Sequence, residues 1–323
     1  MRELSRSFRP YLWATSTAEA ARIAGISPEQ VLRFDANTAP HAPSAARPDA
    51  LSAALAEVQG YPHGGYTSLV EAIARYAGVD AENVVLGAGA DDLILLCARA
   101  LAGPGDHVAV LDEPTYPLLR VSIWLAGAEV GDESPAFTFC CRPHNPTGAL
   151  REIPAQRPLV IDEAYYEYCG DSAVHLLEEG VVVIRTLSKA FGIAGARVGY
   201  ALAERETARE LNARQAPAPL STLSAALALA VLADPPDLEP LVEEREQLAE
   251  GLRMLGLAPL PSAANFVYLP LDRAPEVAQE LLRKGMVVRD YPGALRITVL
   301  DRESDDRLLR ELGVLLAEEA PVG

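Results

Sequence analysis

The sequence predicts an α/β protein in which a mostly parallel sheet is sandwiched by helices, together with a smaller α+β domain. Half of the 323 residues are hydrophobic and 23% are charged, a composition typical of a globular protein with a substantial core. From about residue 67, short apolar runs alternate with helical patterns, as in parallel sheets covered on both faces. This alternation ends at Asp234-Pro235-Pro236. We therefore expect a large domain over residues 41–236 and a small domain formed by 1–40 and 237–323.

The elements of the large domain follow from apolar runs bounded by turn-forming residues. The expected strands are 83–86, 107–111, 136–141, 158–161, 181–185 and 199–203. The expected helices are 68–77, 91–101, 117–126 and 204–213. Only nine residues separate Gly148 from the strand that begins at Pro158. Because a parallel crossover normally needs about a dozen residues or more, we expect no full helix there and a thin cover on that part of the sheet.

The small domain is expected to begin with a long amphipathic helix over residues 238–255. The strands expected after it are 265–269, 287–289 and 295–299. Helices are expected after the first and the last of these strands. We therefore expect the small domain to be an α+β unit.

The charge and cysteine content exclude several classes of protein. A formal net charge of −17 argues against binding to nucleic acid or to an anionic membrane surface, because both require basic patches. The apolar run 220–232 is too short to span a membrane. The four cysteines lack the spacing of a metal site or a disulfide framework: Cys97, Cys140, Cys141 and Cys169. We therefore expect a cytoplasmic protein with reduced thiols and no metal site.

One lysine stands out because the chain has so few. Among the 28 basic residues only Lys189 and Lys284 are lysines, so an ordinary surface cation in this chain is expected to be arginine. Lysine can lose its proton and act as a nucleophile or base, whereas the guanidinium of arginine stays protonated. Lys284 lies at the end of a predicted helix, before a glycine. Lys189 lies in the stretch 186–200, which directly follows a buried strand, and is the candidate for chemistry.

Polar residues follow several strands of the predicted parallel sheet. These strands lead into the stretches Gly87-Ala88-Gly89-Ala90-Asp91, Asp112-Glu113-Pro114-Thr115-Tyr116, His144-Asn145-Pro146-Thr147-Gly148, Asp162-Glu163-Ala164-Tyr165 and Thr186-Leu187-Ser188-Lys189. Each stretch alone is commonly a turn or a helix cap. Because ligands bind at the carboxyl ends of parallel strands, the stretches together predict one site. An anion cradle, a carboxylate and an amine are what pyridoxal 5′-phosphate requires of a protein.

These motifs resemble those of the fold-type I pyridoxal-phosphate aminotransferases of class I/II, most closely those like histidinol-phosphate aminotransferase. The most specific motifs are Asn145-Pro146-Thr147-Gly148, Asp162-Glu163-Ala164-Tyr165 and the stretch 186–199, in this order, and the resemblance covers nearly the whole chain. It implies the fold of type I pyridoxal-phosphate transferases, with residues 41–236 binding the cofactor. It also implies transamination between an amino donor and a 2-oxo acid, in amino-acid biosynthesis.

The resemblance implies a role for each matching residue. Lys189 binds the cofactor covalently and moves a proton, Asp162 pairs with the ring nitrogen, and Tyr116 stacks on the ring; these three are the expected catalytic residues. Asn145 and Tyr165 are expected to bind the phenolic oxygen. The expected phosphate ligands are the amides of Ala90 and Asp91 together with Thr186, Ser188 and Arg197.

The resemblance also implies a homodimer and a substrate site. Tyr61 is similar to the tyrosine that reaches the phosphate bound by a partner subunit. Arg296 resembles the family's arginine for the substrate anion, while Arg289 and Tyr11 resemble positions that hold a substrate phosphate. Asn37 belongs to the family's N-terminal motif, but Thr38 follows it where the family has an acidic residue. Histidinol phosphate with 2-oxoglutarate is the expected substrate pair.

Three alternatives remain open at the level of the sequence. A pyridoxal-phosphate decarboxylase or lyase acting on a phosphorylated amino acid, such as threonine phosphate, shares the same machinery. A nicotinamide-dependent oxidoreductase would use Gly87-x-Gly89 and Asp112, although Asp92 stands where a third glycine is expected. That alternative leaves Asp162 and Lys189 unexplained. A non-catalytic relative is disfavoured because both of these residues are present.

Overall fold

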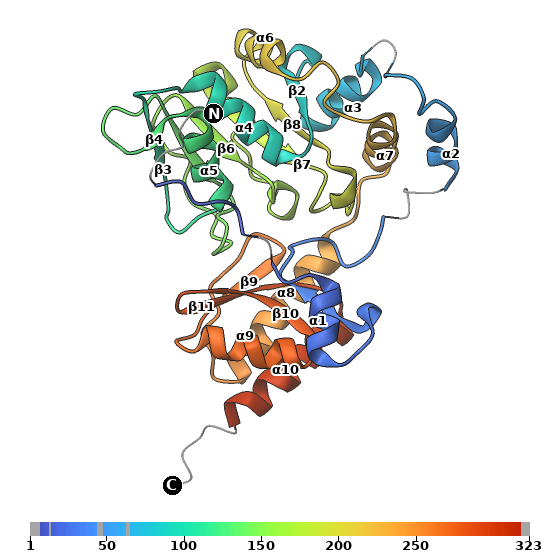
Figure 1. Ribbon diagram of the computed structural model, residues 1–323, viewed down its shortest axis with the longest axis vertical. Coiled ribbons are helices and arrows are strands. Elements are labelled where there is room, and N and C mark those ends of the chain that lie inside the picture. Colours follow the sequence, from blue (N-terminus) through green and yellow to red (C-terminus); the bar gives the residue numbers. More distant parts are fainter. Residues whose placement is uncertain (1–6, 13, 44–47, 63–64, 318–323) are drawn as a thin grey trace. The chain divides into compact units, whose positions relative to one another are not determined.

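The computed structural model describes residues 7–12, 14–43, 48–62 and 65–317, and the chain divides into two compact units (Figure 1). Unit 1 consists of Met1–Tyr11, His41–Asn145 and Arg151–Pro236. Unit 2 consists of Leu12–Pro40, Pro146–Leu150 and Asp237–Gly323. Among the described residues, the helices are all too short or too polar to cross a membrane.

The described part of unit 1 contains a seven-stranded sheet with the strand order β2-β8-β7-β6-β5-β3-β4. The strands are β2 (Val84–Gly87), β3 (His107–Val110), β4 (Glu129–Val130), β5 (Phe137–Cys141), β6 (Leu159–Asp162), β7 (Val181–Thr186) and β8 (Gly199–Leu202). Strand β8 pairs antiparallel with β2 and β7, whereas the other neighbouring pairs are parallel. The predicted mostly parallel sheet is confirmed.

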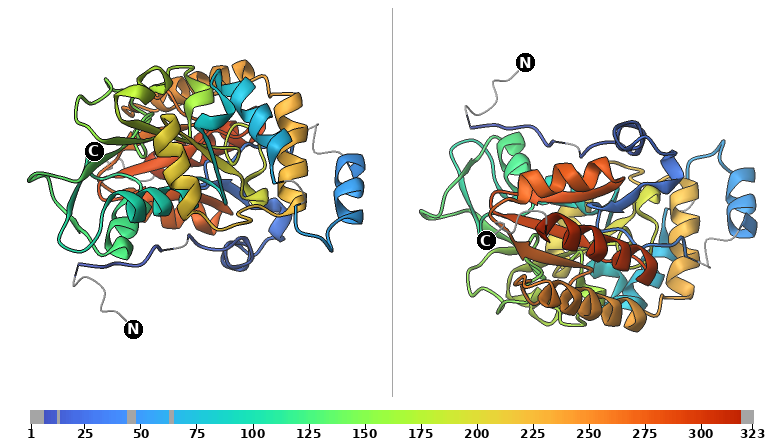
Figure 2. Two further views of the ribbon diagram at one scale, coloured as in Figure 1. Left: turned by 90° about the horizontal axis from the view of Figure 1, so that it is seen from above. Right: turned by 90° about the horizontal axis from the view of Figure 1, so that it is seen from below.

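Helices cover this sheet with apolar side chains. They are α2 (Pro48–Ala56), α3 (Thr67–Ala77), α4 (Ala90–Leu101), α5 (Pro117–Ala126), α6 (Arg205–Arg214) and α7 (Thr222–Ala233). Leu93 and Ile94 of α4 pack with Leu119 of α5 and Phe139 of β5 in one buried cluster. Each such side chain contributes about 1.5–3 kcal/mol when it is fully buried. Helix α7, which the sequence did not predict, lies alongside α3 (Figure 2).

The crossover between β5 and β6 contains no helix, as the sequence predicts. All residues of 142–158 are described, and their backbone contains turns and bends but no helix or strand. The side chain of Arg142 is buried at the start of this crossover, and its Nε donates to the carbonyl oxygen of Arg151 at 2.7 Å. Arg142 thereby holds the short crossover in place of a packed helix.

Unit 2 contains, among its described residues, a four-stranded sheet in the order β1-β10-β11-β9. The strands are β1 (Leu32–Phe34), β9 (Phe266–Pro270), β10 (Met286–Tyr291) and β11 (Ala294–Thr298), and the helices are α1 (Thr17–Ala24), α8 (Glu239–Met254), α9 (Ala274–Arg283) and α10 (Arg302–Ala317). Phe34, Leu248, Leu281 and Leu308 belong to its buried cluster. The sequence predicted α8 to α10 and three of the strands, and it missed α1 and β1.

The two units differ from the predicted domain boundaries at two segments. The described residues up to Tyr11 belong to unit 1, where the ring centroids of Phe8 and Trp124 are 6.1 Å apart and those of Tyr11 and Tyr116 are 6.3 Å apart. Residues 146–150 belong to unit 2 because the N–H of Ala263 donates to the carbonyl oxygen of Gly148 at 2.7 Å. Elsewhere the boundaries at 40/41 and 236/237 coincide with the division.

Candidate active site

The site in unit 1 is built at the carboxyl ends of β5, β6 and β7. The strand register aligns Asp162, the last residue of β6, with Cys141 on β5 and with Ile184 on β7. Thr186 ends β7 and is aligned with Gly199 of β8. Side chains that are far apart in the sequence are therefore brought to one edge of the sheet, as the sequence predicts.

Asp162 is a buried carboxyl group, with 6% of its surface exposed. Its Oδ1 accepts from the N–H of Ala164 at 3.1 Å, and its Oδ2 accepts from the Sγ of Cys141 at 3.7 Å. The pKa of Asp162 is raised to about 7: burial is the main cause and the charge of Asp91 adds to it, while the hydrogen bond from Ala164 and the charge of Lys189 oppose the rise. A carboxyl group in this environment favours a cationic partner, which would stabilise its charged form.

Lys189 lies in the turn that follows β7. Its side chain is half-buried, and its Nζ lies 5.9 Å from the ring centroid of Tyr165. Its charge acts on Asp162, so an amine and a carboxyl group share this edge of the sheet. Lys284, by contrast, forms an ion pair with Glu311 at 2.6 Å in unit 2, which agrees with the solvated helix end predicted for it.

Arg197, Ser188 and Thr186 form a set of donors suited to an anion. Nη1 of Arg197 donates to Oγ of Ser188 at 3.3 Å, and Oγ1 of Thr186 donates to the same atom at 2.8 Å. Nη2 of Arg197 donates to Oδ2 of Asp91 at 2.9 Å. Guanidinium and hydroxyl donors arranged in this way bind phosphate well.

Two glycines allow the backbone at the start of α4 to approach these donors. A Cβ at Gly199 would lie 2.5 Å from the carbonyl carbon of Gly89 and 2.7 Å from the amide nitrogen of Ala90. Gly89 has φ +84°, and a Cβ on it would lie 2.6 Å from Nη2 of Arg197. Only glycine fits both positions. The first N–H groups of α4, which have no partner within the helix, therefore lie close to the guanidinium, as at other anion sites.

Tyr116 lies directly before α5, and its hydroxyl donates to Oδ1 of Asp91 at 2.9 Å. Burial, followed by the nearby charge of Asp91, raises the pKa of Tyr116, so its hydroxyl stays protonated. Asp91 thus joins Tyr116 to Arg197 through its two carboxylate oxygens. This bridging role was not part of the prediction, which assigned only the amide of Asp91.

Asn145 and Tyr165 are both buried, with 7% and 4% of their surfaces exposed. Asn145 follows β5, and Tyr165 lies three residues beyond Asp162, the last residue of β6. Both residues therefore lie in segments that follow neighbouring strands of the sheet. Tyr11 contacts Tyr116 at the edge of its ring. Tyr61 is 84% exposed and bonds to none of these groups in the described part of the chain.

The remaining predicted residues belong to unit 2. Arg296 on β11 lies directly opposite Arg289 on β10. Nη2 of Arg296 donates to the carbonyl oxygen of Asp35 at 2.7 Å, and its Cζ lies 5.3 Å from the ring centroid of Phe266. The N–H and Oδ1 of Asn37 both bond to Oγ1 of Thr298 at 2.9 Å. Asn37 and Arg296 are thus held in a buried polar group of their own.

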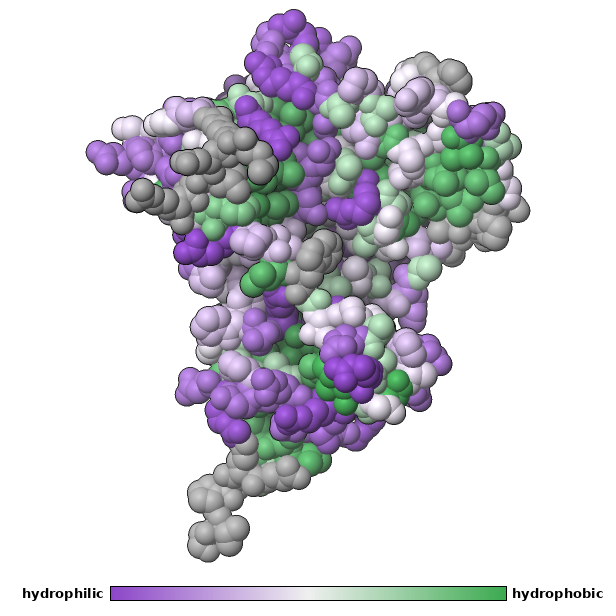
Figure 3. Space-filling model, in the orientation of Figure 1, coloured by the Kyte–Doolittle hydropathy of each residue, from purple (hydrophilic) through white to green (hydrophobic). Residues whose placement is uncertain are grey.

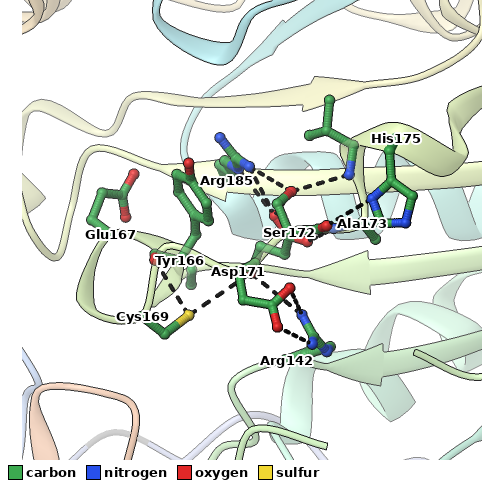
Figure 4. Close-up of polar contacts among 12 residues, drawn as sticks. Arg142, Tyr166, Glu167, Cys169, Asp171, Ser172, Ala173, His175 and Arg185 are labelled. Carbon is green, nitrogen blue, oxygen red and sulfur yellow. Dashed lines mark hydrogen bonds and ion pairs between the residues drawn. The ribbon is translucent and has the colours of Figure 1, made fainter. Parts of the chain in front are cut away.

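A buried network adjoining Asp162 was missed by sequence reasoning. Glu163 and Arg185 are fully buried and form an ion pair at 3.1 Å, and Ser172 bonds to both (Figure 4). The signal was present in the sequence as an arginine inside the otherwise apolar run 181–186 and as a second carboxylate directly after Asp162. Buried charges of this kind require partners.

Comparison with known proteins identifies relatives along nearly the whole chain. The family model described as aminotransferase class I and II matches residues 29–132 and 132–312. Histidinol-phosphate aminotransferase 2 of Pseudomonas aeruginosa is 33% identical and aligned over 96% of both chains. Histidinol-phosphate aminotransferase of Caldanaerobacter subterraneus subsp. tengcongensis is 34% identical over 80% of this chain and 84% of its own.

The fold is shared with a solved structure of the same kind. The crystal structure of histidinol-phosphate aminotransferase from Sinorhizobium meliloti in complex with pyridoxal-5′-phosphate superimposes with a TM-score of 0.84. It covers 98% of this chain and 99% of its own, at 24% identity. The likeness confirms the predicted fold class. The family match also removes the nicotinamide-dependent oxidoreductase alternative.

Proposed function

The chain belongs to the aminotransferase class I and II family, and we propose that it transfers the amino group of histidinol phosphate to 2-oxoglutarate with pyridoxal 5′-phosphate as cofactor. The observation that carries the proposal is the group formed by Asp162, Lys189 and the donors around Arg197 at one edge of the sheet. The substrate pair is supported by curated relatives of that name at 33% and 34% identity.

The residues present fit this cofactor. Asp162 is a buried carboxyl group that favours a cationic partner, which the protonated ring nitrogen would be. Gly89 and Gly199 keep the start of α4 free of side chains that would block a phosphate. Arg197, Ser188, Thr186 and the amides of Ala90 and Asp91 would hold that phosphate, and Asn145 and Tyr165 would hold the phenolic oxygen. When it is bound, the cofactor supplies an electron sink that stabilises negative charge at the substrate carbon.

The side chains of this protein then have separate tasks. Asp162 would hold a proton at the ring nitrogen, because a cation that faces it offsets the cost of burying its carboxylate. The Nζ of Lys189 would hold the cofactor covalently and would accept and return a proton during the transfer. Tyr116, whose hydroxyl is fixed by Asp91, would lie against the ring and orient it. Asp91 also orients Arg197 for the phosphate.

Unit 2 is proposed to supply the substrate residues Arg289, Arg296 and Asn37. Arg289 and Arg296 lie opposite each other on β10 and β11, and like charges in this arrangement repel. Anionic groups of a substrate bound beside them would relieve that repulsion. We assign Arg296 to the substrate carboxylate, Arg289 with Tyr11 to the substrate phosphate, and Asn37 to a place beside them. In this proposal unit 1, which includes Met1–Tyr11, is the cofactor domain, and unit 2, which includes Pro146–Leu150, is the small domain.

We further propose that the active form is a homodimer in the cytoplasm. Large apolar side chains near the end of α2 are exposed: Leu55 by 60%, Val58 by 50% and Tyr61 by 84%. The same part of unit 1 shows a hydrophobic area in Figure 3. Exposed apolar patches of this kind commonly mark interfaces between proteins. Tyr61 of one subunit would then reach the phosphate bound by the other.

Borohydride reduction followed by peptide mapping tests the proposal directly. The purified protein should be yellow, and the reduced cofactor should be found on the peptide that contains Lys189. Label on Lys284 alone, or no label with cofactor present, would refute the cofactor site. The substrate is tested by comparing histidinol phosphate, aromatic amino acids and threonine phosphate as amino donors. Release of carbon dioxide from threonine phosphate without amino transfer would favour the decarboxylase alternative.

A further inference from the structure

The buried ion pair Glu163–Arg185 lies directly beside the residues assigned to the cofactor but faces away from them. Glu163 follows Asp162 in the sequence, and Arg185 precedes Thr186. The N–H of Glu163 donates to the carbonyl oxygen of Ile184 at 2.8 Å, which extends the β6–β7 pairing by one residue beyond Asp162. Successive side chains of a strand point to opposite faces of the sheet. The pair therefore occupies the face opposite to Asp162 and Thr186.

Glu163 uses both carboxylate oxygens. Oε2 accepts from Nε of Arg185 at 3.1 Å and from Oγ of Ser172 at 2.8 Å, while Oε1 accepts from the N–H of Ala173 at 2.7 Å. Nη2 of Arg185 donates to Ser172 at 2.7 Å (Figure 4), so these two side chains and Glu163 form a closed ring of bonds. The bonds to Ser172 and Ala173 tie the loop that follows Asp162 back onto the end of β6. Tyr165 lies within this tied loop.

Arg185 is also enclosed by groups from other elements. Its Cζ lies 3.5 Å from the ring centroid of Tyr166. Glu167 is buried nearby, and burial raises its pKa to about 7 while the charge of Arg185 opposes the rise. Tyr200 of β8 and Tyr76 of α3 complete the surroundings, and the hydroxyl of Tyr76 lies 3.5 Å from Oε1 of Glu167.

The groups that influence the pKa of Asp162 come from the face of the sheet opposite to the Glu163–Arg185 pair and from the neighbouring strand β5. They are Asp91 of α4, Lys189, Cys141 and the hydroxyl of Tyr116, while Cys140 of β5 is influenced by both Asp162 and Glu163. Glu163 is the next residue along the chain, and an uncompensated carboxylate there would repel the charge that Asp162 must carry. Arg185 supplies the compensating positive charge. The guanidinium keeps this charge because it does not lose its proton in proteins.

We propose that Glu163 and Arg185, with Ser172, are positioning residues that hold the Asp162 carboxylate and the Tyr165 loop in place for the cofactor while adding no net charge behind Asp162. The inference rests on the proposed function, because it concerns the cofactor held by Asp162 and Lys189. It assigns these residues no contact with the cofactor or the substrate.

The test uses the full-length protein freed of cofactor and titrated with pyridoxal 5′-phosphate. The dissociation constant and the pH midpoint of the visible absorption band, which follows the proton at the Lys189 nitrogen, are measured for wild type and variants. Glu163→Gln leaves Arg185 uncompensated, so we expect the midpoint to fall by about one pH unit and the affinity to fall about tenfold. Glu163→Asp keeps the charge and should keep the midpoint, with a smaller loss of affinity.

The double variant Glu163→Gln/Arg185→Met removes both charges. We expect its midpoint to return to the wild-type value, while its affinity stays low because the bonds to Ser172 and Ala173 are altered. The matched control is Glu204→Gln, since Glu204, like Glu163, is a glutamate that accepts from backbone N–H groups, here at the start of α6. That control should lose stability without a change in midpoint or affinity.

Each outcome of these measurements either supports or overturns the inference. Folded Glu163→Gln with the wild-type midpoint and affinity, or with a lower melting temperature alone, would overturn it. If Glu163→Gln does not fold, the affinity of Glu163→Asp decides, and an unchanged value rejects positioning. A wild-type protein without a visible band and without label at Lys189 would refute the proposed function, and the inference with it. A labelled wild type beside unaltered variants would refute the inference alone.

Discussion

Asp162 in unit 1 and Asp305 in unit 2 are both buried carboxyl groups, and burial is the main cause that raises their pKa, to about 7 and about 8. Their neighbours differ. Asp162 lies at the end of a parallel strand within the influence of Lys189, whereas Asp305 lies in the first turn of α10. Oδ1 of Asp305 accepts from the N–H of Leu300 at 3.2 Å, and its further charged neighbours are acidic: Glu244, Asp301 and Asp306.

The comparison teaches that a perturbed carboxyl group is not by itself a catalytic one. Burial produces the same shift in both units, but only Asp162 has an amine and a set of anion donors at the same sheet edge. We therefore expect substitutions around Asp162 to change cofactor chemistry. Substitution of Asp305 should change stability alone.

The largest effect is expected from Lys189→Arg, which removes the amine but keeps a cation. Turnover should fall by about three orders of magnitude or more, because a guanidinium can neither bind the cofactor covalently nor pass on a proton. Reduction with borohydride followed by peptide mapping should find no label on the altered peptide. Retained label or turnover would show that the chemistry lies elsewhere, and Lys284→Arg serves as the control that should behave as wild type.

Asp162→Asn is expected to have the next largest effect. An amide cannot hold the proton at the ring nitrogen as a carboxylate does, so turnover should fall about a hundredfold or more, while Asn can still accept from the N–H of Ala164 and preserve the fold. Steady-state kinetics and circular dichroism measure the two effects. Full activity would reduce Asp162 to a cap at the end of β6, and its environment would then resemble that of Asp305.

Arg289→Ala sharpens the role of unit 2. A charge-assisted bond to a phosphate is worth about 1.5–3 kcal/mol, so kcat/KM for histidinol phosphate should fall about 10- to 100-fold. Amino acids without a phosphate should be much less affected. The control is Arg283→Ala, an exposed arginine that pairs with Glu280 on α9. An equal loss for both classes of substrate, or none for either, would show that Arg289 is structural.

The smallest effect is expected from Asp305→Asn. Since burial raises the pKa of Asp305 to about 8, the folded state keeps a proton that the unfolded state releases near pH 4. The stability that this proton supplies is present at low pH and is lost as the pH rises from about 4 to 8. Asparagine does not ionise, so the variant does not lose this stability as the pH rises. Its free energy of unfolding, measured by denaturation, should therefore exceed that of wild type by about 1 kcal/mol at pH 8.5 and should equal it at pH 4. Asp306→Asn is the control, and cofactor affinity should not change.

Much of the fold could be predicted, and so could the gathering of the candidate residues at one edge of the sheet, because both follow from strand ends. Asp162 comes directly after an apolar run, and Asn145 and Lys189 come a few residues after one; parallel topology brings such positions together. Helix α7 was missed because its sequence is apolar on all faces, so it lacks the periodicity that marks an amphipathic helix. Strand β1 is three residues long and pairs with β10, far along the chain.

The features that sequence reasoning missed depend on register or on burial. Arg289 and Arg296 were predicted as substrate residues, but their position opposite each other follows only from the register of an antiparallel pair, which a one-residue shift would abolish. Arg185 was treated as part of an apolar strand, since charged residues are rarely fully buried. Its partner Glu163 was noted only as the residue after Asp162, and its bonds to the loop that follows Asp162 were not predicted. Partners of this kind become visible only when three dimensions are known.

The helix-free crossover between β5 and β6 also bears on how the chain folds. Cys141 and Asp162, which face each other across these strands, are 21 residues apart in sequence. Folding rates rise as contacting residues lie closer along the chain, because less loop entropy is lost before contacts form. We therefore expect the β5–β6 pair, fastened by Arg142, to be among the earliest parallel pairs to form. The carboxylate at the end of β6 would then be in place before strand β1 of unit 2 pairs in parallel with β10, far along the chain.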